Sequence, residues 1–301
     1  MSKKLLTHLH VLTFNENFTE IDDGAILIDG STIAETGPTD VLRKHTDTAI
    51  IDCTGKVAMP GLINAHTHIP MSFLKGLGHS DPEVIYSLMF PAERNLVPSD
   101  LEILTKAGAA EALRSGCTTV VEHYYFAEEI ARSMKSMGIR GFVGHTTMDR
   151  MGPHIGEKEY RASYNFVEKW HGDPLITPVL APHATDTVSE EKLRELLRKA
   201  ETEDLLLHLH VAQTQKEVSL IKKEFNKTPV EFLESLGFLS DRVLAAHLIY
   251  VTDSDIAVLK KRRVNFLCCV VSQLFFEKLA PIDRLIKAGI NFCPWNRLCS
   301  M

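Results

Sequence analysis

The sequence lacks several features that mark special classes of protein. No apolar run approaches the roughly 20 residues of a membrane-spanning helix. The net charge is −6 with all 14 histidines neutral, so no basic surface indicates a nucleic-acid partner. There is no internal repeat and no low-complexity tract. These absences favour a globular protein that binds neither nucleic acid nor a membrane.

The sequence also lacks the cysteine spacing of a disulfide-rich protein and a complete signal peptide. The six cysteines lack the paired spacing of a disulfide framework or a zinc knuckle, so we expect reduced thiols. The first residues contain lysines and leucines, as a signal peptide does. However, His8 and His10 interrupt the apolar stretch, and no small-residue cleavage site follows. We therefore expect the chain to begin with a β-strand of a cytoplasmic protein.

What is present fits a globular chain that is long enough for one large α/β barrel. Its 301 residues are 45% hydrophobic and 24% charged, near the globular average, and such a barrel needs about 250 residues. Short strands are expected at 11–14, 24–28, 32–37 and 49–52, with a hairpin turn at Asp29-Gly30. We interpret residues 1–57 as a β-sandwich portion and residues 58–301 as a barrel domain.

After residue 58, short apolar runs alternate with helical stretches, which is typical of βα units. The expected strands are 57–63, 117–121, 141–144, 175–180, 205–210, 243–247, 264–270 and 289–293. The expected helices are 100–115, 127–137, 160–171, 189–201, 216–225, 229–236, 253–261 and 281–288. Ser189 and Thr252 stand where two of these helices need an N-cap. Eight βα units predict an α/β fold of the TIM-type (β/α)8 class.

Five histidines fall at the carboxyl ends of expected strands, where a barrel places its active site. They are His66, His68, His183, His210 and His247. Side chains two residues apart on a strand share a face, so His66 and His68 can hold one cation. Imidazole suits a divalent transition metal, Zn²⁺ first and Fe²⁺ second. In the pair His208 and His210, one member can instead be a buried histidine that is hydrogen-bonded inside the barrel.

Residues 59–68, with the sequence MPGLINAHTH, resemble the metal-binding signature of the amidohydrolase superfamily. The branch that the chain resembles contains the methylthioadenosine and S-adenosylhomocysteine deaminases and the triazine chlorohydrolases. Further matches are residues 116–120, 181–184 and 208–212, and His247 followed by Thr252-Asp253. The resemblance extends to about residue 289, and the ordered set of motifs is far more specific than any single one.

The resemblance implies a role for each matched residue. His66, His68 and His210 would bind the metal, and His247 would act beside them as a ligand or a proton shuttle. His183 and Glu93 would contact the substrate. The implied chemistry is hydrolysis at a carbon–nitrogen bond other than a peptide bond. A water activated by one divalent metal would deaminate a purine-like or triazine-like ring. Members of the family commonly associate, so a homo-oligomer is also implied.

One catalytic position departs from the family pattern. The family deaminases carry a glutamate three residues after the histidine that matches His210, and this chain has Gln213 there. An amide is neither a general acid nor a general base at neutral pH, although it can orient a water. Because chloride leaves as an anion and needs less help from a proton donor than ammonia does, Gln213 favours a chlorohydrolase-type displacement as the alternative reaction.

The second departure lies at the end of the chain. The family's eighth strand ends in Leu-Gly-Thr-Asp, whose aspartate binds the metal, whereas residues 293–301 read CPWNRLCSM. Read one base later, the codons of this tail force a glycine and permit Ala-Leu-Gly-Thr-Asp-Ser. We therefore expect a one-base insertion near codon 293 and a barrel that is incomplete at its C-terminal end. The third alternative is accordingly an inactive, truncated fragment.

Overall fold

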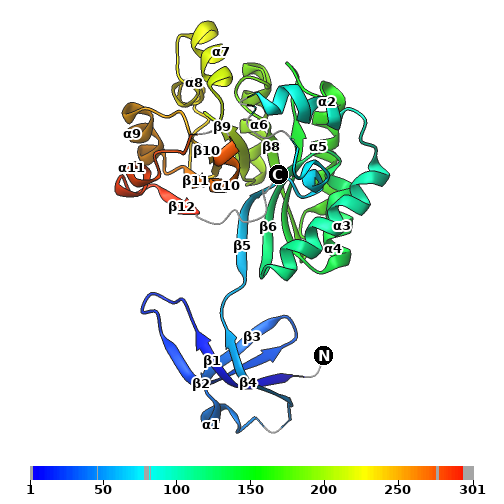
Figure 1. Ribbon diagram of the computed structural model, residues 1–301, viewed down its shortest axis with the longest axis vertical. Coiled ribbons are helices and arrows are strands. Elements are labelled where there is room, and N and C mark those ends of the chain that lie inside the picture. Colours follow the sequence, from blue (N-terminus) through cyan, green and yellow to red (C-terminus); the bar gives the residue numbers. More distant parts are fainter. Residues whose placement is uncertain (1–2, 46, 78–80, 82, 276–277, 294–301) are drawn as a thin grey trace. The chain divides into compact units, whose positions relative to one another are not determined.

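The computed structural model describes residues 3–45, 47–77, 81, 83–275 and 278–293. The chain divides into two compact units, Met1–Gly61 and Leu62–Met301. The first unit contains one sheet of four strands, and the second contains parallel strands that alternate with helices (Figure 1).

The first unit is a mixed sheet in the strand order β3-β2-β1-β4. Its elements are β1 (Lys4–Leu12), β2 (Glu20–Asp29), β3 (Thr32–Pro38), the short helix α1 (Thr39–Leu42) and β4 (Ala49–Ala58). The pairs β1–β2 and β2–β3 are antiparallel, whereas β1 and β4 are parallel. Gly30 takes a φ of 62° in the predicted turn between β2 and β3, a conformation that glycine adopts without strain. The side chains of Leu5, Ala25, Leu27 and Leu42 form a small core of this unit.

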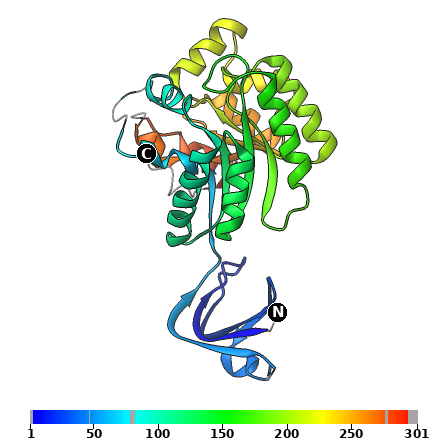
Figure 2. The same cartoon turned by 90° about the vertical axis from the view of Figure 1, so that its right-hand side faces the viewer.

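The second unit is an eight-stranded parallel sheet in which each strand lies beside its neighbours in sequence, from β5 to β12. The strands are β5 (Leu62–Thr67), β6 (Cys117–Tyr124), β7 (Arg140–Thr147), β8 (Ile176–Pro182), β9 (Leu207–Val211), β10 (Val243–His247), β11 (Asn265–Leu267) and β12 (Asn291–Cys293). The sheet curls into a half-barrel with helices on its outer side (Figure 1, Figure 2). This arrangement confirms the predicted TIM-type fold class.

Helices connect successive strands of the half-barrel. Between β5 and β6 lie η1 (Ile69–Leu74), η2 (Ile85–Met89), α2 (Phe90–Glu93) and α3 (Pro98–Arg114). The later helices are α4 (Ala127–Met137), α5 (Glu157–Trp170), α6 (Glu190–Glu203), α7 (Gln215–Phe225), α8 (Pro229–Ser235), α9 (Asp253–Arg262), α10 (Val270–Phe275) and α11 (Ile282–Lys287). Among the helices of the described residues, none has the length and apolar character needed to cross a membrane.

Local chemistry explains where the predicted limits agree with the structure. The side chain of Ser189 accepts a hydrogen bond from the backbone N–H of Lys192 at the start of α6. At the start of α9, the side chain of Thr252 accepts one from the backbone N–H of Asp255. Several expected strands have other limits in the structure, and two of them show why. Residues up to Ala58 continue β4, so the first barrel strand begins only at Leu62. The seventh ends at Leu267, because the apolar run continues into a helix rather than a strand.

Strand β9 illustrates how the fold aims side chains into the barrel. All five of its residues are buried. Leu207, Leu209 and Val211 pack in one cluster with residues of the helices α6 and α8. Side chains alternate along a strand, so His208 and His210 point to the opposite face, which is the barrel interior. The leucines therefore fix the register that presents the two histidines to the site.

Candidate metal centre

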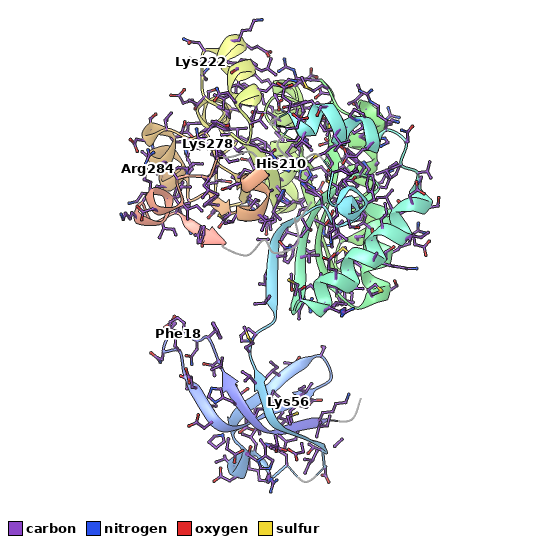
Figure 3. The ribbon with its side chains drawn as sticks, in the orientation of Figure 1. Phe18, Lys56, His210, Lys222, Lys278 and Arg284 are labelled. Carbon is purple, nitrogen blue, oxygen red and sulfur yellow. The ribbon has the colours of Figure 1, made fainter. Side chains whose placement is uncertain are left out.

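Four histidines from three segments converge at the carboxyl ends of the parallel strands. His66 lies near the end of β5, His210 lies in β9, and His247 is the last residue of β10. One ring nitrogen from each of these three lies within 4.8 Å of the others. The fourth, His68, directly follows β5, and its Nε2 is 3.2 Å from the Nε2 of His210. Figure 3 labels His210 in the interior of the second unit.

The hydrogen bonds of His68 and His210 indicate which nitrogens carry protons. The Nδ1–H of His68 donates to the backbone carbonyl of His123 at 2.5 Å, and the Nδ1–H of His210 donates to that of His183 at 2.8 Å. A neutral ring protonated at Nδ1 has a lone pair at Nε2. The two lone pairs therefore face each other across 3.2 Å, where they repel unless a cation lies between them. Two nitrogens bound to a tetrahedral zinc are roughly 3.3 Å apart, so this donor pair fits a divalent metal.

His66 is held by another imidazole. Its Nδ1 lies 2.8 Å from the Nε2 of His208, and the two rings are nearly perpendicular, at 85° with centroids 4.9 Å apart. With Nδ1 engaged in this way, Nε2 is the nitrogen of His66 that a metal would use. His208 is therefore a buried, hydrogen-bonded histidine that orients a candidate ligand.

Burial keeps these rings neutral at physiological pH. It lowers the pKa of His68 to about 4 and the pKa of His247 to about 3. The pKa values of His66 and His210 are also well below the ordinary value, first through burial and then through the neighbouring histidines. Neutral imidazole is the form that binds a metal, so the cluster has the protonation state that coordination requires.

Glu122 fixes the backbone on both sides of His68. Its carboxyl oxygen Oε2 accepts the hydroxyl proton of Thr67 at 2.5 Å and the backbone N–H of Ile69 at 2.9 Å. Burial raises the pKa of Glu122 to about 8. Because the residues immediately before and after His68 share one carboxyl group, the ring of His68 starts from a fixed backbone position.

The backbone at His247 is in a conformation that non-glycine residues rarely adopt. The φ angles of His247 and Leu248 are 78° and 48°, and such left-handed residues are concentrated at functional sites. The side-chain amide of Gln273 donates to the His247 carbonyl at 3.1 Å, and its oxygen accepts from the backbone N–H of Ala280 at 2.9 Å. The surrounding structure thus holds the strained turn, and the ring of His247 stacks near that of His210 at 5.4 Å.

A pocket opens onto the histidine cluster, and every site residue expected from the sequence lines it. These residues are His66, His68, Glu93, His183, His210, Gln213 and His247. The apolar side chains of Met71, Met89 and Phe90 form part of the same wall. The ring of Phe90 lies 5.6 Å from that of His183. The pocket therefore combines apolar side chains with a few polar groups, as small-molecule sites do.

Glu93 brings the only carboxyl group of the expected set into this pocket. It is the last residue of α2 and is only 3% exposed. The Tyr124 hydroxyl donates to its Oε1 at 2.8 Å. Burial raises the pKa of Glu93 to about 8, which favours the protonated carboxyl group at neutral pH. His183 faces the same space, with its Nδ1 2.9 Å from the Thr187 hydroxyl.

The backbone at Gln213 is held by the buried carboxyl group of Glu217. Glu217 accepts the backbone N–H groups of Gln213 and Ala212 at 2.8 and 3.1 Å. It also accepts the Thr185 hydroxyl proton at 2.6 Å. The Glu217 carboxyl group is thus used in hydrogen bonds to the backbone, and Glu217 does not line the pocket. Gln213 does line it, so Gln213 is the residue that the segment after β9 presents to the site.

Sequence reasoning missed the residues that support the site. His123 lines the pocket, with its Nδ1 2.7 Å from the Thr146 hydroxyl. It escaped attention because the expected strand stops at residue 121, whereas β6 continues to Tyr124. Glu122 and Glu217 gave no signal, because a lone glutamate in a sequence reads as a surface residue. Of the tail on which the frameshift hypothesis rests, residues 294–301 lie outside the described residues.

Comparisons with known proteins identify the family to which this sequence is similar. A model of the amidohydrolase family matches residues 57–293. The chain is 40% identical over 272 residues to a 5'-deoxyadenosine deaminase of Methanothrix thermoacetophila, covering 89% of this chain and 64% of the relative. It is 33% identical to a 5-methylthioadenosine/S-adenosylhomocysteine deaminase of Carboxydothermus hydrogenoformans, covering 95% of this chain and 66% of the relative. The chain thus spans about two thirds of the length of these curated relatives.

Two solved structures share the fold. An adenosine deaminase from Xanthomonas campestris, with bound zinc, is 28% identical with a TM-score of 0.88 over 97% of this chain and 68% of its own. A triazine hydrolase of Arthrobacter aurescens is 22% identical with a TM-score of 0.87 over 100% of this chain and 73% of its own. The family model matches most of the chain, and the curated relatives match it in sequence. The chain therefore belongs to the amidohydrolase family.

Proposed function

We propose that this chain carries the metal site of a hydrolase that deaminates a purine-like ring, with an adenosine derivative as the substrate class. The observation that carries this proposal is the Nε2 pair of His68 and His210, 3.2 Å apart with both Nδ1 atoms bound to carbonyls. The named activities of the two curated relatives support the substrate class.

In this proposal His66, His68 and His210 hold one divalent metal, Zn²⁺ first and Fe²⁺ second. Zinc is supported by the zinc-bound relative, and the imidazole donor set accepts either ion. When bound, the metal supplies a water that ionises near neutral pH. The chain's own groups do the remaining work of binding, orienting and moving protons.

The polar groups around the pocket divide that work. In this proposal His247 acts beside the ligands as a ligand or a proton shuttle, and the hydrogen bond from Gln273 to its carbonyl holds its backbone. Glu93 and His183 bind the substrate, with the Glu93 carboxyl group facing hydroxyl groups of a ribose-like part. The apolar side chains of Met71, Met89 and Phe90 cover the flat ring. Gln213 orients a water or the leaving group through its amide.

Gln213 supports a second candidate reaction, the displacement of chloride from a triazine ring. Because the amide cannot deliver a proton to a departing amine at neutral pH, a group that leaves as an anion fits this position better. The shared fold with a triazine hydrolase is compatible with either reaction. An inactive protein is the third outcome, and the same experiment decides among the three.

The test is a side-by-side assay of the purified chain before and after loading with Zn²⁺. Deamination of 5'-deoxyadenosine and methylthioadenosine is followed by the ultraviolet change that accompanies the loss of the amino group. Chloride release from a chlorotriazine is measured in parallel. Metal-dependent deamination supports the main proposal, and chloride release alone supports the second. Turnover of neither substrate class by a chain with one zinc bound contradicts both.

We also propose a cytoplasmic location and a small-molecule substrate as the principal partner. Support for the location comes from Cys53, Cys117, Cys268 and Cys269, which are buried free thiols, as expected for a reducing compartment. A homo-oligomer stays a prediction, which light scattering on the purified chain would test.

A further inference from the structure

The three candidate ligands differ in what holds their Nδ1 atoms. Those of His68 and His210 are bound by backbone carbonyls, which no side-chain substitution can remove. The Nδ1 of His66 instead lies 2.8 Å from the Nε2 of His208, which is a side-chain atom. The orientation of His66 therefore depends in part on a side chain that can be replaced.

The proton arrangement follows from the use of His66 as a ligand. If its Nε2 binds the metal, its Nδ1 must carry the proton and donate it to His208. The Nε2 of His208 is then the acceptor, and its own proton lies on Nδ1. A neutral imidazole holds only one proton, so His208 cannot also donate from its Nε2. Both rings are thereby fixed in a single tautomer.

This arrangement is costly for His208 itself. Its side chain is completely buried, and among the described residues its Nδ1 has no hydrogen-bond partner. A buried polar group without a partner destabilises a fold. A leucine or methionine would fill the same space between β8 and β10 without that cost. A role in packing alone therefore does not explain a histidine at this position.

We propose that His208 is a positioning residue that orients the metal ligand His66 and sets the metal affinity of the site. This inference rests on the proposed function, because it takes His66 as a ligand. A neutral imidazole is a weaker acceptor than the carboxylate that often supports a metal-bound histidine. His208 consequently fixes the ring without adding negative charge, which leaves the metal a stronger Lewis acid.

The test compares two substitutions of nearly equal size. His208→Gln places an amide oxygen near the position of the lost Nε2, and His208→Met fills the space without an acceptor. The readout is the Zn²⁺ affinity of the full chain, measured by competition with a chromophoric chelator. We expect His208→Met to weaken zinc binding by about 10- to 100-fold, the usual effect of losing such a partner. His208→Gln is expected to stay close to the original affinity.

A second readout excludes a simple folding defect. The metal-free His208→Met protein should melt close to the metal-free original, because the substitution removes a buried N–H without a partner but also removes the hydrogen bond to His66, and the two effects offset. His208→Asn is a further variant, since its shorter amide falls short of the Nε2 position, and it should weaken zinc binding as Met does. It also serves if the Met variant does not fold.

The outcomes separate the two proposals. If the original chain takes up no zinc, the proposed function fails. If the original binds zinc and the Met and Asn variants bind it equally well, only the role of His208 is overturned. Equal weakening by Gln and Met would also overturn it, because the acceptor would then not matter.

Discussion

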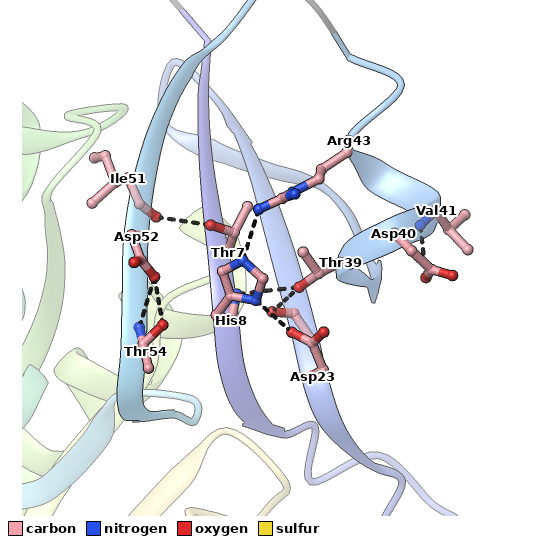
Figure 4. A network of polar contacts seen from close by, with 11 residues as sticks. Thr7, His8, Asp23, Thr39, Asp40, Val41, Arg43, Ile51, Asp52 and Thr54 are labelled. Atoms are coloured by element: carbon pink, nitrogen blue, oxygen red, sulfur yellow. Dashed lines mark hydrogen bonds and ion pairs between the residues drawn. The ribbon is translucent and has the colours of Figure 1, made fainter.

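The histidines of the first unit and the candidate metal ligands of the second have opposite surroundings. In the first unit the histidines are partly exposed and contact carboxylates: the Nδ1 of His8 lies 2.9 Å from an oxygen of Asp23, and the Nε2 of His45 lies 2.9 Å from Glu35. Figure 4 shows His8 between Asp23 and Arg43. In the second unit His66 and His210 are buried, and their partners are other histidines and backbone carbonyls.

The difference shows how a fold separates histidines that pair with surface charges from histidines suited to bind a cation. An exposed histidine beside a carboxylate gains little, because water screens the pair. A buried histidine among neutral groups stays neutral and keeps a lone pair for a metal. Surroundings, rather than residue type, therefore mark the candidate site, and four substitutions sharpen the comparison.

The largest effect is expected from His66→Ala. Removing a proposed ligand should lower zinc affinity by more than about 100-fold, beyond the usual cost of losing a supporting residue, and should abolish turnover. Metal content after dialysis and chelator competition measure the change. Retention of both metal and activity would show that the ligand assignment is wrong.

Next in size is Gln213→Glu, which restores the carboxylate of the family deaminases. General acid–base catalysis contributes about 100- to 10,000-fold, so we expect deamination of an adenosine derivative to rise by at least about 10-fold in kcat. Chloride release from a chlorotriazine should gain less, and it serves as the control. An unchanged kcat for deamination would mean that Gln213 never occupied the proton-transfer role.

A smaller effect concerns the pH dependence of stability through Glu93. Burial raises its pKa to about 8 in the folded chain, so between about pH 5 and pH 8 the folded state holds a proton that the unfolded state has lost. Stability must then fall as pH rises through this range. In Glu93→Gln the fall should be smaller by about 1–3 kcal/mol, as judged from urea unfolding at both ends. Parallel stability curves for the two proteins would refute the shifted pKa.

The smallest effect is expected from His8→Ala in the first unit. The His8–Asp23 contact is exposed, and surface pairs of this kind contribute little to stability. The melting temperature should change by less than about 2 °C, and zinc affinity should not change at all. A weaker zinc affinity in this variant would mean that the two groups of histidines are not functionally separate.

The clustering of the expected histidines could be predicted because the motif spacing and the strand period act together. His66, His68, His210 and His247 could be placed at strand ends from apolar runs alone, and the structure brings them together. Strand limits were less predictable. The run from residue 57 to 63 joins the end of β4 to the start of β5, and an apolar stretch carries no mark of where one strand becomes another.

The sequence indicated that His208 or His210 could be a buried, hydrogen-bonded histidine, but the contacts of the supporting residues could not be predicted, for a physical reason. Glu122 contacts Thr67 and Ile69, and His208 contacts His66 across 142 positions. These contacts arise only when β5, β6 and β9 lie in one curled sheet. A glutamate gives no sign of whether it will be buried, so only the folded chain reveals that it holds a ligand segment in place.

The central claim is that His66, His68 and His210 hold one divalent metal through their ring nitrogens. X-ray absorption at the zinc edge of the zinc-loaded chain tests it most directly. We predict about three imidazole nitrogens at about 2.0–2.1 Å from the metal. A sulfur neighbour at about 2.3 Å, or a shell of oxygens alone, would contradict the assignment.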